Sequence, residues 1–243
     1  MINLYSLGII SDIHSNIEAL EACLTDMNCN YPEIKEIYCI GDLVGYGPDP
    51  KKCIKCLFNN NLVTKIVKGN HEHYVDQTVT PPQVTPIAKA AIDYQIKNIP
   101  LELRWELAHL PQFIATNHLN RAITLVHGSP QYPLNAYVYP NSQEQEDLFQ
   151  YMINLEVDIL ALGHTHVPFI RKETQNDKEY LMLNPGAIGQ PRDNNHKASY
   201  AVIDVQNMDA EISRVEYDID SVAKRIISVG LPESLASRLY KGI

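Results

Sequence analysis

The segment SLGIISDIHSNIEALEACLTDM, residues 6–27, decides the fold, because an apolar run passes through a short polar turn into a helical pattern. The apolar run at residues 4–11 predicts a buried strand. Beyond the turn, apolar side chains recur at helical spacing, with Asn16 or Ser15 placed to cap the helix. A second apolar run at residues 36–40 completes a predicted β-loop-α-β unit.

The alternation of strands and helices continues along the chain. Pro50 is placed to begin a helix that ends at about Phe58, and residues 62–67 predict a third strand. Strands separated by helices favour a parallel sheet. After a connector opened by Pro81-Pro82, the pattern predicts helices at 87–98, 101–110 and 143–155, strands at 113–116, 122–126, 157–162, 167–171, 180–183, 200–205 and 211–217, and an apolar helical tail covering the protein's own sheet.

Length and composition favour one domain in an aqueous compartment. The 243 residues are 45% hydrophobic and 20% charged, within the ordinary globular range, so we expect a single domain over residues 1–243. No stretch approaches the roughly 18 apolar residues of a membrane span. The N-terminus shows no basic leader or small-residue cleavage site, so we expect a cytoplasmic protein whose five cysteines are reduced.

The net charge of −9 argues against duplex nucleic acid as a partner, because such binding needs a broad basic face. A local anion site is compatible with this charge, since two divalent cations add about four positive charges at one point. The acidic balance therefore favours a small phosphorylated substrate over a polymer. The oligomeric state is not readable from the sequence.

Five short polar segments each follow an apolar run that predicts a buried strand, so each lies where a strand ends in a loop. Their side chains are the oxygen and imidazole ligands that a two-metal phosphoesterase centre requires. The five segments are Asp12-Ile13-His14, Gly41-Asp42, Gly69-Asn70-His71-Glu72, His127-Gly128 and Gly163-His164-Thr165-His166.

The spacing within these segments indicates shared ions. On extended backbone, residues two apart lie on the same side, so Asp12 and His14 are able to hold one ion. By the same spacing, His164 and His166 reach adjacent ions. Asp42 follows a glycine and is able to offer one oxygen to each of two metals.

Asn70 supplies a neutral amide oxygen, and the next residue, His71, points the other way and addresses the substrate. Each segment has a simpler interpretation when taken alone. A Gly-Asn turn explains residues 69 and 70, and a lone histidine such as His127 is more often a packed core residue than a ligand. The joint order of the five segments favours the metal centre.

These segments resemble those of the calcineurin-like metallophosphoesterase superfamily, in particular its small YfcE-like phosphodiesterase branch. Two further stretches, GYGPDP at 45–50 and NPGAIGQPR at 184–192, are typical of that branch. The resemblance covers nearly the whole chain and implies an α/β fold, a four-layer αββα sandwich. It implies one metal held by Asp12, His14 and His166, a second held by Asn70, His127 and His164, and Asp42 bridging the two.

The resemblance also implies a mechanism. Two metals about 3.5–4 Å apart lower the pKa of a bridging water, and the resulting hydroxide attacks phosphorus in line without a phosphoenzyme. His71 is the expected catalytic residue, orienting the phosphate and protonating the leaving oxygen. Mixed Asp, Asn and His ligands suit borderline ions such as Mn²⁺, Fe²⁺, Zn²⁺ or Co²⁺ better than Ca²⁺. Mn²⁺ is the ion expected to support activity in vitro, with Fe, Zn, Co, Ni or Mg as alternatives.

Two loop residues are candidates for substrate binding. Arg192 is able to bind a pair of phosphate oxygens, and Tyr46 to stack on an aryl group or base, although a surface turn and simple packing explain them equally well. The predicted activity is a phosphodiesterase, with dinucleoside polyphosphate hydrolase, phosphomonoesterase and exonuclease as alternatives and a non-catalytic scaffold as the competing class. A redox or zinc role for Cys53 and Cys56 is disfavoured, because no second cysteine pair accompanies them.

Overall fold

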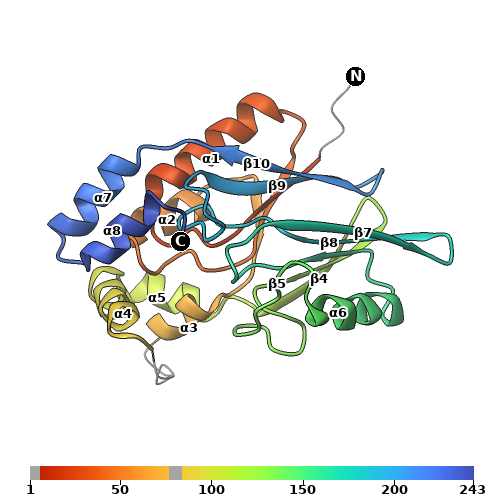
Figure 1. Ribbon diagram of the computed structural model, residues 1–243, viewed down its shortest axis with the longest axis horizontal. Helices are drawn as coiled ribbons and strands as arrows, with labels where there is room; N and C mark the ends of the chain where they lie inside the picture. Colours follow the sequence, from red (N-terminus) through yellow and green to blue (C-terminus); the bar gives the residue numbers. More distant parts are fainter. Residues whose placement is uncertain (1–5, 77–83) are drawn as a thin grey trace.

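The computed structural model of the protein describes residues 6–76 and 84–243, and it places two β-sheets face to face between outer helices (Figure 1). The predicted connector at Pro81-Pro82 lies outside the described residues. Within the described ranges, no helix is long and apolar enough to cross a membrane.

The first sheet has the strand order β10-β9-β1-β2-β3. Its parallel part is the predicted β-α-β series of β1 (Leu7–Ile10), β2 (Glu36–Cys39) and β3 (Val63–Ile66). β9 (Ala198–Asp204) pairs antiparallel with β1, and β10 (Asp209–Val215) pairs antiparallel with β9. The predicted parallel pairing of the first three strands is confirmed, and the C-terminal hairpin, which returns to lie beside β1, makes the whole sheet mixed.

The second sheet has the order β4-β5-β6-β8-β7 and is also mixed. β5 (Arg121–Val126), β6 (Ile159–Ala161) and β8 (Lys178–Asn184) are parallel. β4 (Phe113–His118) and β7 (Phe169–Gln175) pair antiparallel with β5 and β8 at the two edges. The parallel strands are neighbours within each sheet, with β3 forming an edge of the first, so their carboxyl ends lie on the same side of each sheet.

The helices follow the predicted segments closely. α1 (Ile17–Asn30) is capped by Asn16, whose side-chain oxygen accepts a hydrogen bond from the backbone N–H of Ala19 at 3.2 Å. α3 was not predicted, because its short sequence begins with a Gly-Asn pair that also favours a turn. The other helices are α2 (Pro50–Phe58), α3 (Asn70–Val75), α4 (Pro86–Asn98), α5 (Leu101–Ala108), α6 (Gln143–Asn154), α7 (Ile219–Ser228) and α8 (Glu233–Leu239).

Alternating side chains of the strands build the layers of the expected αββα sandwich. In β1, Leu7 and Ile9 face the second sheet, whereas Ile10 faces α1 and α2. On the far side of the second sheet, Leu160 and Leu162 pack against α6. The four-layer fold is confirmed.

The C-terminal helices do not cover a sheet, contrary to the prediction. The apolar faces of α7 and α8 pack against each other, against Ala91 of α4 and against Tyr46. The tail is amphipathic, as its sequence indicates, but its partner surface is formed by another helix and a loop. This arrangement brings α8 beside the segment that follows Asp42.

Candidate metal centre

All seven predicted metal ligands follow the carboxyl ends of parallel strands, where the two sheets meet. The first sheet supplies Asp12 and His14 after β1, Asp42 after β2 and Asn70 after β3. The second sheet supplies His127 after β5, and His164 and His166 after β6. All seven are buried, with exposed fractions of 7% or less.

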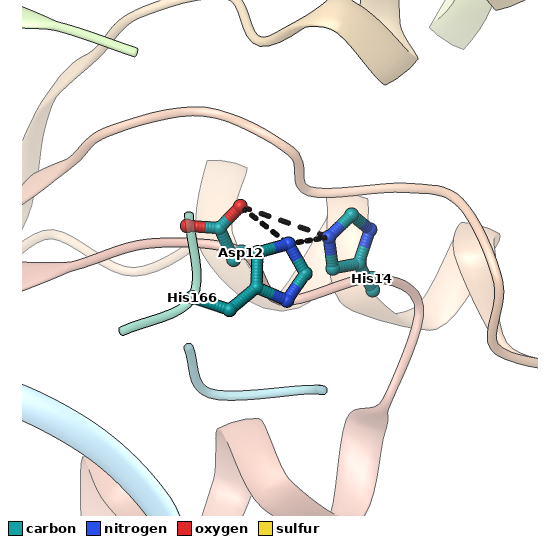
Figure 2. A group of neighbouring side chains, drawn as sticks. All are labelled: Asp12, His14 and His166. Atoms are coloured by element: carbon teal, nitrogen blue, oxygen red, sulfur yellow. Dashed lines mark hydrogen bonds and ion pairs between the residues drawn. The ribbon is translucent and has the colours of Figure 1, made fainter. Parts of the chain in front are cut away.

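Asp12, His14 and His166 form the first of three groups whose ligand atoms lie within metal-binding distance of one another (Figure 2). Nε2 of His14 lies 3.1 Å from Nε2 of His166. Oδ1 of Asp12 lies 3.2 Å from the His166 nitrogen and 3.7 Å from the His14 nitrogen. Three potential ligand atoms thus converge from β1 and from the loop after β6.

The second nitrogens of these two histidines fix which ring atom faces the centre. Nδ1 of His14 lies 3.1 Å from the backbone oxygen of Val44, and Nδ1 of His166 contacts that of Gln190. A carbonyl oxygen only accepts hydrogen bonds, so each Nδ1 carries a proton, and in the neutral form of each ring the lone pair of Nε2 faces the centre. Two facing lone pairs repel unless a cation lies between them. The arrangement therefore fits a metal.

His127 lies at the centre of the second group of potential ligands, which also contains Asn70, His164 and Asp42. Its Nδ1 donates to the backbone oxygen of Ile40 at 2.7 Å, which again turns Nε2 toward the centre. That nitrogen lies 3.2 Å from Oδ1 of Asn70, 3.2 Å from Nδ1 of His164 and 3.3 Å from Oδ2 of Asp42. Both oxygen and nitrogen ligands are present, as borderline divalent ions prefer.

Asp42 connects the two groups. Its Oδ2 atom lies 3.3 Å from Nε2 of His127 and 3.7 Å from Nε2 of His14. The other oxygen, Oδ1, accepts the backbone N–H of His71 at 2.9 Å, which fixes the orientation of the carboxylate. One carboxylate oxygen is therefore held between the two sets of imidazoles.

The electrostatics of the centre favour a bound cation. Burial opposes ionisation of Asp42, but the surrounding imidazoles, His127 foremost, hold its pKa well below the usual range. Burial also opposes protonation of His127, yet Asp42 and then Asp12 raise its pKa to about 10. Burial lowers the pKa of His164 to about 3 and that of His166 to about 4, which keeps both imidazoles in the neutral, ligating form.

Two buried atoms of the centre lack hydrogen-bond partners among the described residues. They are Oδ1 of Asp12, which faces the imidazoles of the first group, and Nε2 of His164. An unsatisfied buried polar atom costs about 1–3 kcal/mol. A metal ion bound to these two atoms would offset that cost, so their lack of partners is consistent with a cation site.

The backbone of the centre is strained. The prediction of extended backbone at Asp12 and His14, and at His164 and His166, is wrong. Five of the seven predicted ligands have positive φ: Asp12 (53°), His14 (47°), Asp42 (53°), His164 (68°) and His166 (60°). Such residues cost roughly 1–3 kcal/mol each and occur mainly at functional sites. The paired side chains still converge, but through tight left-handed turns at the strand ends.

Glycine is required at two positions beside the ligands. A Cβ atom at Gly69 would collide with the Asp42 carboxylate, and one at Gly163 would collide with the Ser11 hydroxyl beside Asp12. Both glycines therefore permit close approach of the backbone to the centre.

His71 lies in α3, not on extended backbone, so the predicted alternation of Asn70 and His71 is wrong. The two side chains nevertheless both face the centre, because they occupy the first turn of a helix that points at it. His71 forms a third possible ligand group with His14 and Asp42, and its ring centroid lies 4.9 Å from that of His14. Burial lowers the pKa of His71 to about 3.

Glu72 is a site residue whose role sequence reasoning missed. Its Oε2 accepts the backbone N–H groups of Asp42 and Gly69, each at 2.8 Å, and its Oε1 accepts that of Val44 at 3.1 Å. Burial, and then the Asp42 carboxylate, raise the pKa of Glu72 to about 7. A glutamate at the third position of a helix often accepts such bonds, so the Gly-x-x-Glu spacing was the available signal.

The two predicted substrate-binding residues lie together at the rim. Cζ of Arg192 lies 5.6 Å from the centroid of the Tyr46 ring, and that ring lies 4.8 Å from His14 and 4.6 Å from His71. Tyr137, which the sequence did not single out, places its ring 4.1 Å from that of His164 while remaining 51% exposed. An aromatic wall with one guanidinium thus borders the buried ligands.

Cys53 and Cys56 lie in α2 as free thiols. Cys53 is fully buried and packs in the core, and burial raises the pKa of both thiols. Raised pKa values reduce thiolate character, which agrees with the expectation against a redox or zinc role.

Comparison with known proteins identifies the family to which this geometry belongs. Residues 5–208 match the calcineurin-like phosphoesterase superfamily domain. The chain belongs to this superfamily. Members of the calcineurin-like family typically bind divalent metals, and the described residues contain the three candidate groups of aspartate and histidine given above.

Relatives of similar length accompany this match. The uncharacterized protein MJ0912 of Methanocaldococcus jannaschii is 35% identical, over 97% of this chain and 98% of its own. A crystal structure of a metallophosphoesterase from Sphaerobacter thermophilus is 30% identical, with a TM-score of 0.79, over 99% of this chain and 100% of that chain. The hypothetical protein PH1004 of Pyrococcus horikoshii, 23% identical with a TM-score of 0.87 over 98% of both chains, supports the fold alone.

Proposed function

We propose that this calcineurin-like protein is a metal-dependent phosphoric ester hydrolase that acts as a phosphodiesterase on small phosphorylated substrates. The observation that carries the proposal is the position of the Asp42 carboxylate, whose Oδ2 lies within 4 Å of Nε2 of both His14 and His127. A single oxygen between two sets of buried imidazoles is suited to bridging two cations.

The proposed ligand sets follow the two halves of the centre. Asp12, His14 and His166 hold one divalent cation, and Asn70, His127 and His164 hold the other, with Asp42 shared between them. When bound, two such ions lower the pKa of a water molecule and neutralise charge on the phosphate oxygens. Mn²⁺ is the proposed ion for activity in vitro, since mixed oxygen and nitrogen ligands suit it.

The chain's own residues would bind the phosphate, orient it and move a proton. His71 is placed to donate a hydrogen bond to the substrate, because its imidazole lies beside His14 and Asp42 and its low pKa keeps the ring neutral. A neutral imidazole carries one N–H that binds a phosphate oxygen, and protonation of a leaving oxygen needs the imidazolium form, which the negative charge of a bound phosphate would favour by raising the pKa of His71. Tyr46 and Tyr137 would flank that leaving group.

The test is hydrolysis of bis-p-nitrophenyl phosphate by the full chain with Mn²⁺. We expect p-nitrophenol release that a chelator abolishes and that added Mn²⁺ restores, because the proposed ions lower the pKa of the attacking water. The matched monoester p-nitrophenyl phosphate is measured in parallel. Faster hydrolysis of the monoester would replace the diesterase assignment with a phosphomonoesterase. Absence of turnover with both substrates would favour the non-catalytic scaffold.

A further inference from the structure

Arg192 and Arg238 meet at the rim of the metal centre, although they are 46 positions apart and Arg238 lies beyond the residues that match the superfamily domain. Nη2 of Arg192 donates to Oε1 of Gln190 at 2.9 Å, and Nη1 of Arg238 lies 3.5 Å from the same oxygen. The two guanidinium groups thus converge on one amide oxygen. The backbone oxygen of Gln190 contacts Nδ1 of the predicted ligand His166, so the pair adjoins the centre.

The two arginines share no carboxylate. Asp193, the residue that follows Arg192, pairs with Arg214 instead. Within the described residues, neither Arg192 nor Arg238 forms an ion pair, and Nε of Arg192 is buried without a hydrogen-bond partner. Burial, and then the positive charge of Arg192, lower the pKa of Arg238.

Packing of the C-terminal helices maintains this unfavourable proximity of like charges. Leu235 and Leu239 of α8 line, with His14 and Tyr46, a small cavity at the edge of the centre. Arg238 lies on the same short helix, so the apolar contacts of α8 hold its backbone beside the centre. Two paired cations beside a metal centre repel one another unless an anion enters between them, and phosphate, like carboxylate, matches the geometry of the planar guanidinium fork.

We propose that Arg192 and Arg238 form a subsite for a second phosphate group of the substrate, bonded through oxygen to the phosphate that reacts. The proposal rests on the proposed function and names its substrate class, compounds with a phosphoanhydride such as dinucleoside polyphosphates. His71 is the proposed proton donor to the leaving oxygen, and its ring lies 4.6 Å from that of Tyr46. Cζ of Arg192 lies 5.6 Å from the same Tyr46 ring. We therefore assign the second phosphate to the leaving group.

The reaction balances as hydrolysis. The oxygen of water bonds to the reacting phosphorus, and the P–O bond to the second phosphate breaks with its electron pair. One proton of the water goes to the departing phosphate oxygen and the other remains on the new phosphate hydroxyl. A departing phosphate carries more negative charge than an aryl oxide, which is the charge that two guanidinium groups stabilise.

The test compares kcat/KM for diadenosine tetraphosphate with that for bis-p-nitrophenyl phosphate, both with Mn²⁺. We expect Arg238→Ala to lower the ratio of the two values by about tenfold or more, because a charged hydrogen bond to the second phosphate is lost. Arg238→Gln, which keeps a polar side chain, is expected to lower the ratio similarly. Lys241→Ala removes one positive charge from the same exposed C-terminal segment and is expected to leave both activities unchanged.

Binding supplies a readout that needs no turnover. Calorimetry on the Mn²⁺-loaded protein measures affinity for imidodiphosphate, a non-hydrolysable diphosphate, against inorganic phosphate. The wild-type chain is expected to prefer imidodiphosphate, and the two Arg238 variants to lose that preference.

An unchanged kcat/KM ratio in both variants, or equal affinity for the two anions in the wild type, would overturn the second-phosphate subsite. Failure of the wild type to hydrolyse bis-p-nitrophenyl phosphate would instead overturn the proposed function.

Discussion

The candidate metal centre is buried at the ends of parallel strands, whereas its rim is partly exposed and comes from loops and the C-terminal helix α8. At the centre, His127 is fully buried and each ring nitrogen has a defined neighbour. At the rim, Tyr137 is 51% exposed and Arg238 reaches the site from the end of the chain. The centre is built for one chemistry, and the rim is where substrates can be distinguished.

This difference predicts two kinds of mutational effect. Changes at the centre should lower turnover of every substrate together, because they remove the chemistry. Changes at the rim should alter the ratio between substrates, because they remove contacts that only some substrates make.

Asp42→Asn gives the largest expected effect. Removing the negative charge from the shared carboxylate weakens both proposed ion sites, and a loss of about 4 kcal/mol of transition-state stabilisation corresponds to about 10³-fold in kcat. Bis-p-nitrophenyl phosphate hydrolysis with saturating Mn²⁺ measures it. Asp93→Asn, a matched change at a 59% exposed residue, should retain wild-type turnover. Full activity in Asp42→Asn would contradict the bridging role.

His71→Ala is expected to lower kcat by roughly 10², the scale of general acid catalysis. The loss should shrink for a diester whose leaving group needs no proton, so a series of aryl phosphodiesters with leaving groups of decreasing pKa separates this role from a structural one. An equal loss across the series would exclude proton donation by His71.

The residues of the centre could be predicted from the sequence more fully than those of the rim. The convergence of the seven predicted ligands could be predicted, because each follows a strand and parallel strands bring their carboxyl ends together. The left-handed backbone at Asp12 and His164 was not predictable, because aspartate and histidine adopt positive φ only where the fold imposes it. Arg238 carried no local signal, since its relevance depends on where α8 packs.

Glu72→Gln tests whether the hydrogen bonds that Glu72 accepts from the backbone stabilise the centre. The amide has one acceptor oxygen, so one of the three backbone N–H groups that the carboxylate accepts would face an N–H₂ group, costing about 1–3 kcal/mol of unfolding free energy. Urea denaturation of the chelator-treated protein measures this cost without any metal contribution. Glu106→Gln, an exposed change of the same kind, should stay within about 0.5 kcal/mol of wild type. Equal stability of the two variants would remove the positioning role of Glu72.

Tyr137→Ala should give the smallest effect. Losing an aromatic contact of about 0.5–1.5 kcal/mol predicts a fall of roughly two- to tenfold in kcat/KM for aryl diesters and little change for alkyl diesters. Tyr132→Ala removes a 68% exposed ring from the same loop and serves as the control. Equal losses of kcat/KM for aryl and alkyl substrates would show that Tyr137 does not distinguish substrates at the rim.

The number of Mn²⁺ ions bound per chain tests the central claim most directly. Equilibrium dialysis followed by elemental analysis, on wild type and Asp42→Asn side by side, measures it without reference to any substrate. The two sets of buried ligands joined by Asp42 predict two ions in the wild type and at most one tightly bound ion in the variant. A wild-type chain that binds no Mn²⁺, or a variant that holds two ions as tightly as wild type, would contradict the account.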